Sequence, residues 1–176
     1  MEWMLMPLRR YAEFTGRSRR MEFWMYQLGV WLLWIALWVV TMAVGFGAAS
    51  AARDPAAGMV GLFASLGIFM VVYAVLGLGL LIPSLAVAVR RLHDTDRSGW
   101  WLLAPLGPYV LAIVITVMGA AAQSSALIGI GFIVNILVLV AAVALLVFYC
   151  LPGTPGPNKY GPDPKGSTAN LAETFQ

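Results

Sequence analysis

Three long stretches of this chain contain no charged residue: 23–52, 55–89 and 98–158. About 20 consecutive apolar residues are enough to cross the hydrocarbon core of a membrane. The whole sequence is 61% hydrophobic and 11% charged, whereas soluble domains are about 45 to 50% apolar and about 25% charged. The chain is therefore predicted to be an all-α integral membrane protein.

The uncharged stretches predict four transmembrane helices, at about 23–49, 59–89, 100–118 and 126–149. A short loop around Arg53 separates the first two. The third stretch has 61 residues, too many for one crossing, and a patch of small and polar residues at 119–125 divides it in two. The prolines and glycine at 105–108 leave an alternative open, in which three full crossings are accompanied by an interfacial or re-entrant segment near Trp100–Tyr109.

The distribution of charge predicts the orientation. With four crossings, residues 1–22, the loop 90–97 and the carboxy-terminal tail share one side of the membrane. That side carries ten of the eleven Lys and Arg residues, and only Arg53 lies opposite. Cytoplasmic loops are enriched in Lys and Arg, so both termini are expected in the cytoplasm.

Polar segments flank the crossings within a single helical membrane domain predicted over 1–164. Residues 1–22 are basic and amphipathic, and the apolar spacing after Pro7 predicts a short interfacial helix there. Residues 151–164 hold five of the ten prolines, which excludes a helix. This cytoplasmic Pro/Gly-rich segment either docks onto the 90–97 loop through Lys159 and Tyr160 or is solvated. A disordered tail is expected over 165–176.

The most distinctive polar stretch is 90–101, Arg-Arg-Leu-His-Asp-Thr-Asp-Arg-Ser-Gly-Trp-Trp. Asp94, Asp96, Ser98 and Gly99 match positions one, three, five and six of a calcium-binding loop. Position twelve of such a loop should be Glu, but here it is Pro105, so a calcium site is not expected. His93 and Cys150 are the only histidine and cysteine, so there is no zinc set and no internal disulfide. No Gly-rich phosphate loop with a following Lys is present. We therefore expect no catalytic residue, no cofactor and no metal, and a protein that is not an enzyme.

The same stretch supports structural roles. Ser98 is placed to cap the helix that follows it, and Asp94 and Asp96 can pair with neighbouring arginines. Trp100 is placed at the membrane interface. Farther along, Asn135 lies well inside the last predicted helix. Such an intramembrane polar residue is a functional candidate, with an interhelical hydrogen bond as the structural alternative.

Three blocks of the sequence resemble the signature blocks of a bacterial inner-membrane family, domain of unknown function 805. They are Gly16 to Trp24, Arg90 to Trp101 and Gly153 to Pro164. The blocks occur in the family's order, and the resemblance extends over nearly the whole chain. The resemblance implies a small, multi-pass helical protein of the bacterial cytoplasmic (inner) membrane with no assigned activity and no catalytic residues. The candidate interaction or family-motif residues are Arg17, Arg19, Arg20, Glu22, Trp24, Arg90, Arg91, His93, Asp94, Asp96, Arg97, Ser98, Gly99, Trp100, Asn158, Tyr160 and Gly161.

The leading functional hypothesis is a membrane interaction or scaffold protein with a basic cytoplasmic face. Its expected partners are the lipid bilayer with anionic headgroups and, beyond lipid, another protein or a second copy of the chain. The alternative is a small-solute transporter or channel subunit that uses Asn135. An interfacial lipid-acting enzyme, with His93 and Asp94 as acid and base, ranks third. Nucleic acid is not expected as a partner, because so much of the chain lies in lipid.

Overall fold

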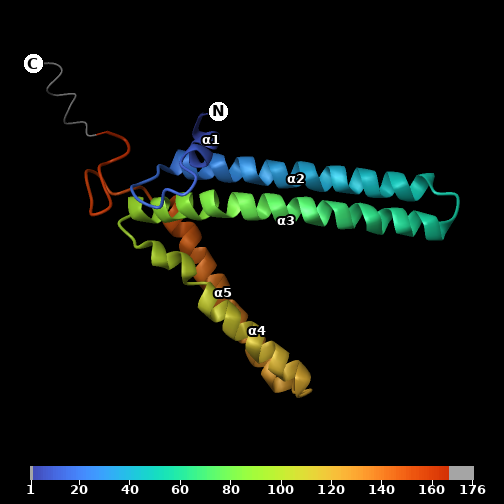
Figure 1. The fold of residues 1–176 in the computed structure, drawn as a ribbon. Helices are drawn as coiled ribbons and strands as arrows, with labels where there is room; N and C mark the ends of the chain where they lie inside the picture. Colours follow the sequence, from blue (N-terminus) through green and yellow to red (C-terminus); the bar gives the residue numbers. More distant parts are fainter. Residues whose placement is uncertain (1, 167–176) are drawn as a thin grey trace, which may run out of the picture. The chain divides into compact units, whose positions relative to one another are not determined.

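The computed structural model describes residues 2–166. Its helices are α1 (Glu2–Arg9), α2 (Arg20–Ala51), α3 (Pro55–Asp94), the 3₁₀ helix η1 (Gly99–Leu103), α4 (Leu106–Ala121) and α5 (Ser125–Cys150) (Figure 1). Within the described residues the only β pairing is an isolated bridge between Asn158 and Gly161. The chain forms two compact units, one of Met1–Glu13 and Trp24–Ala86, the other of Phe14–Phe23 and Val87–Gln176. The all-α prediction is confirmed.

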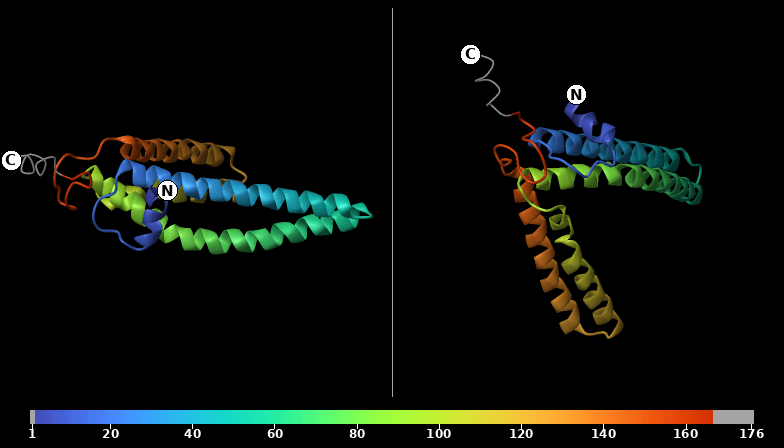
Figure 2. Two further views of the ribbon diagram at one scale, coloured as in Figure 1. Left: turned by 90° about the horizontal axis from the view of Figure 1, so that it is seen from above. Right: turned by 60° about the vertical axis from the view of Figure 1, so that its left-hand side comes forward.

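The first unit is a long hairpin in which α2 and α3 run side by side (Figures 1 and 2). Asp54 begins α3, since its Oδ1 accepts a hydrogen bond of 2.7 Å from the backbone N–H of Ala57, as an N-cap does. Small residues allow the helices to approach each other. A β-carbon added at Gly61 would lie 3.2 Å from Cβ of Ala48.

A proline in α3 explains a contact with the chain that follows α1. Pro83 has no N–H, so the carbonyl of Gly79 four residues earlier receives no hydrogen bond from it. The hydroxyl of Tyr11 donates to that carbonyl at 2.5 Å. The expected helix after Pro7 is wrong: α1 ends at Arg9 and contains Pro7, because a proline in a short helix removes only one backbone hydrogen bond.

The second unit contains a shorter hairpin of η1, α4 and α5, and α4 lies beside α5 in the right view of Figure 2. Ser98 caps η1, accepting from the N–H of Trp100, and this confirms its predicted capping role. Gly119 and Gly131 allow α4 and α5 to pack closely. A β-carbon at Gly119 would lie 2.8 Å from the backbone nitrogen of Ile128.

Among residues 2–166, four helices are long and apolar enough to cross a membrane, as predicted: α2, α3, η1 with α4, and α5. Large apolar side chains on these helices point outward. Val60, Trp38 and Phe132, for example, are 68%, 59% and 70% exposed, which fits a lipid environment. The irregular start expected near Trp100–Tyr109 is present as η1, but η1 and α4 together provide a 23-residue span.

One predicted boundary is wrong. The helix expected at 59–89 runs from Pro55 to Asp94, so Arg90 to Asp94 are helical and not part of a loop. A helix of 40 residues is about 60 Å long, twice the thickness of the hydrocarbon core. The helix therefore has length to spare beyond one crossing, and it does not end at the first charged residue, Arg90.

Candidate functional site

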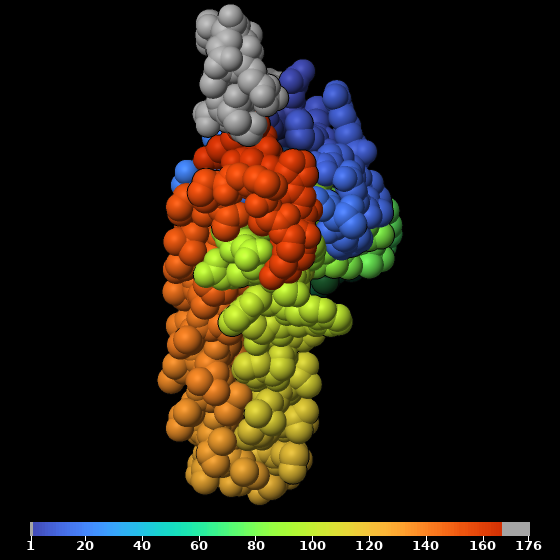
Figure 3. Space-filling view, turned by 90° about the vertical axis from the view of Figure 1, so that its left-hand side faces the viewer, coloured from blue at the N-terminus to red at the C-terminus, as the bar shows by residue number. Residues whose placement is uncertain are grey.

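The polar residues of the second unit gather where three segments meet: 14–23, 90–98 and 151–166. We call these three segments the clasp. They contain the start of α2, the last turn of α3 with the turn after it, and the chain that follows α5. Figure 3 shows the segment after α5 (red) lying across the yellow-green chain at the end of α3. Of the two alternatives left open for 151–164, the structure shows the docked one.

Asp94, the last residue of α3, is the centre of the clasp. Its Oδ1 accepts a hydrogen bond of 3.0 Å from Nε of Arg17, and its Oδ2 accepts one of 2.5 Å from Arg91. The side chains of Asp94, Arg17 and Arg91 are 6%, 1% and 0% exposed. Removing one partner of a buried ion pair leaves the other charge uncompensated and typically costs about 3 to 5 kcal/mol. The predicted pairing of Asp94 with neighbouring arginines is confirmed.

The same two arginines donate to backbone carbonyls at the end of α5 and in the tail. Arg17 donates to the carbonyl oxygens of Thr154 and Gly156, at 2.5 and 2.6 Å. Arg91 donates to that of Tyr149 at 3.1 Å. The last carbonyls of a helix have no partner within it, and a guanidinium presents five donors in a fixed fork. The two arginines therefore hold the end of α5 against the end of α3.

A second buried ion pair supports the first. A terminal nitrogen of Arg90 lies 3.2 Å from Oε1 of Glu22, and their side chains are 0% and 4% exposed. Glu22 lies in the first turn of α2, where the helix dipole favours a carboxylate. The carbonyl of Arg90 also accepts a hydrogen bond of 3.1 Å from the N–H of Ser18. The segment before α2 is thus fixed to α3.

The tail completes the end of α3. Thr154 donates to the Asp94 carbonyl through its N–H (2.8 Å) and its hydroxyl (3.2 Å). The Asn158 amide donates to the His93 carbonyl at 2.9 Å. Gly153 allows this approach, since a β-carbon there would lie 2.6 Å from Cγ of Asp94. The last two carbonyls of α3 thus accept hydrogen bonds from a segment about 60 residues away in sequence.

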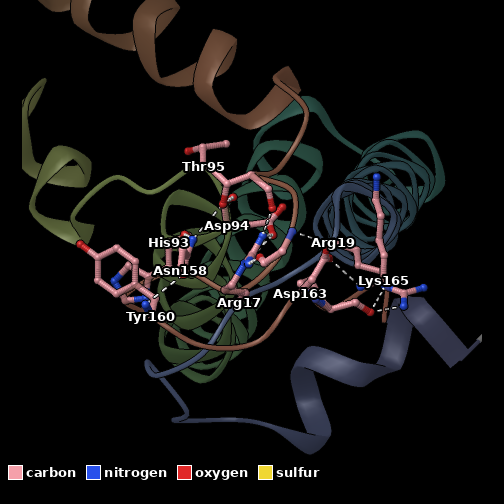
Figure 4. Close-up of polar contacts among 12 residues, drawn as sticks. Arg17, Arg19, His93, Asp94, Thr95, Asn158, Tyr160, Asp163 and Lys165 are labelled. Carbon is pink, nitrogen blue, oxygen red and sulfur yellow. Dashed lines mark hydrogen bonds and ion pairs between the residues drawn. The ribbon is translucent and has the colours of Figure 1, made fainter. Parts of the chain in front are cut away.

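His93 is enclosed between the tail and the segment before α2. Its ring stacks on that of Tyr160, with centroids 3.8 Å apart and an interplanar angle of 3°. Its Nδ1 lies 3.2 Å from the carbonyl oxygen of Gly16. Figure 4 shows His93, Asn158 and Tyr160 on one side of the Arg17–Asp94 pair. The aromatic contact of Tyr160 with the end of α3 agrees with the predicted docking.

The turn after α3 is fixed by backbone geometry. Asp96 adopts a left-handed φ of 56°, a conformation in which Asp is several times more frequent than most non-glycine residues. Gly99 approaches α3 closely, because a β-carbon there would lie 2.8 Å from Val89. Arg97 lies over the ring of Phe148 at 4.0 Å, within the range of a cation–π contact. Residues 96–99 therefore both reverse the chain direction and contact α5.

Other predicted residues lie at the edge of the clasp. Asp96 pairs with Lys159 at 3.6 Å and not with an arginine as expected. Both side chains are about half exposed, and such surface pairs contribute little. Gly161, with φ of 142°, closes the isolated bridge to Asn158. Trp100 is 77% exposed, as an interfacial anchor would be.

Gly99 and Trp100 directly follow the clasp, and two further predicted residues lie outside it. Trp24 is part of the first unit. Asn135 lies in α5, and its amide donates to the carbonyl of Gly131 one turn earlier, at 3.0 Å. The predicted hydrogen bond of Asn135 to another helix is therefore replaced by one within its own helix.

Two residues of the clasp were not predicted from the sequence. Thr154 could not be predicted, because no local feature of the sequence shows which carbonyl group it contacts. Asp163 accepts from the backbone N–H groups of Lys165 (2.9 Å) and Gly156 (3.2 Å). The pKa of the Asp163 carboxyl lies below its ordinary value. The main cause is the hydrogen bond from the N–H of Lys165, followed by the one from Gly156 and the positive charge of Arg17. The Asp-Pro pair within a proline-rich turn was the one available signal.

The arrangement binds chain segments together. Arg17, Arg90 and Arg91, predicted as part of a basic face for lipid, are 5%, 0% and 0% exposed, so they face the protein interior. The described residues contain no group of three or more His, Cys, Asp or Glu that could hold a metal ion. The expected disordered tail at 165–176 lies outside the described residues, apart from Lys165 and Gly166.

Comparison with known proteins gives a consistent picture. Residues 11–162 match the model of a family described as "Protein of unknown function (DUF805)". The chain is 32% identical to the inner membrane protein YhaH of Escherichia coli over 165 residues, which cover 94% of this chain and 98% of YhaH. It is 33% identical to the inner membrane protein YhaI of the same organism, with 94% and 97% covered. No solved structure matches.

These matches extend over the clasp and over all four apolar helices. Together with those helices, the inner-membrane relatives identify a multi-pass protein of the bacterial inner membrane. The chain belongs to the DUF805 family, a family of membrane proteins to which no function has been assigned.

Proposed function

We propose that this protein is a non-catalytic interaction protein of the inner membrane, in which the clasp forms a fixed platform at the membrane surface. The observation that carries the proposal is the buried carboxylate of Asp94, which holds Arg17 and Arg91. Arg17 and Asp94 are 77 residues apart in the sequence. Arg91 also donates to the carbonyl of Leu151, which is 60 residues away. A binding platform requires such a constant shape, since ordering a flexible surface reduces affinity.

The surroundings of His93 and Asp94 support a non-catalytic role. A general base must be free to reach the proton that it removes. Both Asp94 oxygens face guanidinium groups, and the His93 ring is covered by Tyr160. A lipid-acting enzyme built on these two residues would first have to open the clasp. We therefore place that hypothesis behind the interaction protein.

The transporter alternative loses its main support at Asn135. A solute site in the membrane needs polar groups directed at a passage. The Asn135 amide already donates to Gly131 within α5. Intramembrane Asn with a satisfied donor is typical of a structural residue. We place transport second.

The platform is proposed to face the cytoplasm, with both termini on that side. Ten of the eleven Lys and Arg residues lie in the segments on the platform side, and Arg53 lies on the other. Alkaline phosphatase fused after Gln176 is expected to be inactive, whereas a fusion at Arg53 is expected to be active. Strong activity of the carboxy-terminal fusion would overturn this orientation.

Site-directed photocrosslinking in living cells tests the platform itself. A photoreactive amino acid at Pro157 or Lys159, both exposed on the tail, is expected to capture a defined protein or a second copy of the chain. Gly153→Val should abolish that product, because the side chain would displace the tail from Asp94. Gly129→Val is the matched control, since nothing lies within 4 Å of Gly129. Products that persist in Gly153→Val, or no product from either position, would contradict the proposal.

A further inference from the structure

We propose that a hollow beside the clasp binds the phosphate of an anionic lipid headgroup. It has a volume of about 250 Å³ and is lined by Arg19, Arg20, Met21, Asp94, Gly153 and Lys165. This inference deepens the proposed function, on which it rests, by naming the lipid chemistry that the platform recognises.

The electrostatics of the hollow favour an anion. Three of its six lining residues are cationic: Arg19, Arg20 and Lys165. The one carboxylate in its wall, Asp94, is already paired with Arg17 and Arg91. The neighbouring Asp163 accepts from two backbone N–H groups. The wall therefore carries three cationic side chains and one carboxylate, which is shared with two arginines outside the hollow. Guanidinium groups match phosphate oxygens in bidentate geometry.

The start of α2 adds to this field. Arg20 is the first residue of a helix of 32 residues, so the hollow lies beside backbone N–H groups that have no partner within the helix and beside the positive end of its dipole. Such helix ends bind phosphate in many proteins. The acid in this first turn, Glu22, is buried and paired with Arg90, so it does not oppose an anion in the hollow.

The position of the hollow selects a lipid over a free phosphate. A terminal nitrogen of Arg20 lies 3.4 Å from the carbonyl oxygen of Cys150, the last residue of α5. The hollow is thus at the level where two membrane-spanning helices begin and end, which is the headgroup layer. Met21 on its rim is 58% exposed and suits contact with acyl chains. A soluble phosphate would have no use for this apolar rim.

The tail builds one wall of the hollow and positions a cation in it. Arg19 donates through Nε and a second nitrogen to the carbonyl oxygen of Pro164. The next residue in the chain is Lys165, whose N–H is fixed by Asp163. Figure 4 shows Arg19, Asp163 and Lys165 together on the other side of the Arg17–Asp94 pair from His93. The site is therefore complete only when the clasp is closed.

Native mass spectrometry of the full chain with phosphatidylglycerol tests the inference. Arg20→Gln with Lys165→Gln should lower the affinity for this lipid by about tenfold or more, since each cation near an anionic surface contributes about 1 kcal/mol and 1.4 kcal/mol is tenfold. Arg53→Gln with Arg9→Gln removes the same charge from two exposed sites outside the clasp and should leave the affinity unchanged. Phosphatidylcholine should not be retained by any variant.

Three results would overturn the inference. They are an equal loss in both double variants, no retention of phosphatidylglycerol by the unaltered protein, and displacement of the lipid by inorganic phosphate at millimolar concentration. Arg20 and Lys165 are exposed, so the variant is expected to fold, and its melting temperature checks this. If the unaltered protein retains no phosphatidylglycerol but still forms crosslinks at Lys159, only this inference is refuted. The reverse result would refute the protein platform and leave the lipid site standing.

Discussion

Gly153 lies so close to the carboxylate of Asp94 that a β-carbon at position 153 would stand 2.6 Å from Cγ of Asp94. Gly153→Ala is therefore expected to push the carboxylate from its arginines or the tail from α3. Because a disrupted buried ion pair costs about 3 to 5 kcal/mol, the variant should melt at a lower temperature. Trypsin should also cut faster after Lys159.

The control for this change is Gly67→Ala in α3, because nothing lies within 4 Å of Gly67. That variant should be as stable as the unaltered chain or slightly more so, since Ala favours helix by about 1 kcal/mol. Equal trypsin cleavage of the Gly153→Ala variant and the control would show that the tail is not held by this contact.

The Asp94 ion pairs should be energetically coupled. Asp94→Asn leaves two buried guanidinium groups, of Arg17 and Arg91, without their carboxylate, and should cost about 3 to 5 kcal/mol. Arg17→Gln should cost much less in the Asp94→Asn background than in the unaltered chain. Detergent melting of the two single variants and the double variant gives the coupling free energy. Additive losses would mean that the two residues do not interact.

Asp163 should make the stability of the tail depend on pH in one direction. Its pKa in the folded chain lies below the ordinary 3.8, so its ionised form stabilises the folded state above that ordinary value. This contribution is lost as the pH falls through the lowered pKa. The difference in melting temperature between the unaltered chain and Asp163→Asn should therefore be largest near pH 7 and should shrink below about pH 4. A difference that stays constant down to pH 3 would contradict this assignment.

The sequence predicted the helices well, because lipid imposes a simple requirement. Each crossing needs a long uncharged stretch, and only 11% of the residues are charged. The same reasoning failed at the end of α3, where Arg90 and Arg91 were assigned to a loop. Charge excludes a residue from hydrocarbon but does not end a helix, and buried acids here compensate both arginines.

The clasp was predicted in outline. The pairing of Asp94 with arginines and the docking of Tyr160 follow from opposite charges and aromatic character that are visible locally. The sequence does not show that Arg17, Arg90 and Arg91 are buried. Because they are buried, these arginines form ion pairs inside the protein and do not contact lipid as predicted. The contacts of Thr154 with the Asp94 carbonyl could not be predicted, because they join residues 60 positions apart through backbone atoms.

Packing of α4 on α5 should depend on one glycine. A β-carbon at Gly131 would overlap Oγ1 of Thr116, and overpacking of this kind typically costs about 1 to 3 kcal/mol. Gly131→Ala should therefore lower the melting temperature of the protein in detergent. Gly129→Ala, two residues away with open space around it, should not. Equal melting temperatures of the two variants would show that the helices do not pack through Gly131.

The hydroxyl of Tyr11 should matter only because Pro83 is present. It donates to the Gly79 carbonyl, which Pro83, lacking an N–H, cannot satisfy. Tyr11→Phe should cost about 0.5 to 1.5 kcal/mol, the usual net contribution of one hydrogen bond. In a Pro83→Ala background the alanine N–H can bond to Gly79 within α3, so Tyr11→Phe should then cost much less. Melting of the two single variants and the double variant measures this coupling, and an equal cost in both backgrounds would mean that the hydroxyl does not replace the missing backbone donor.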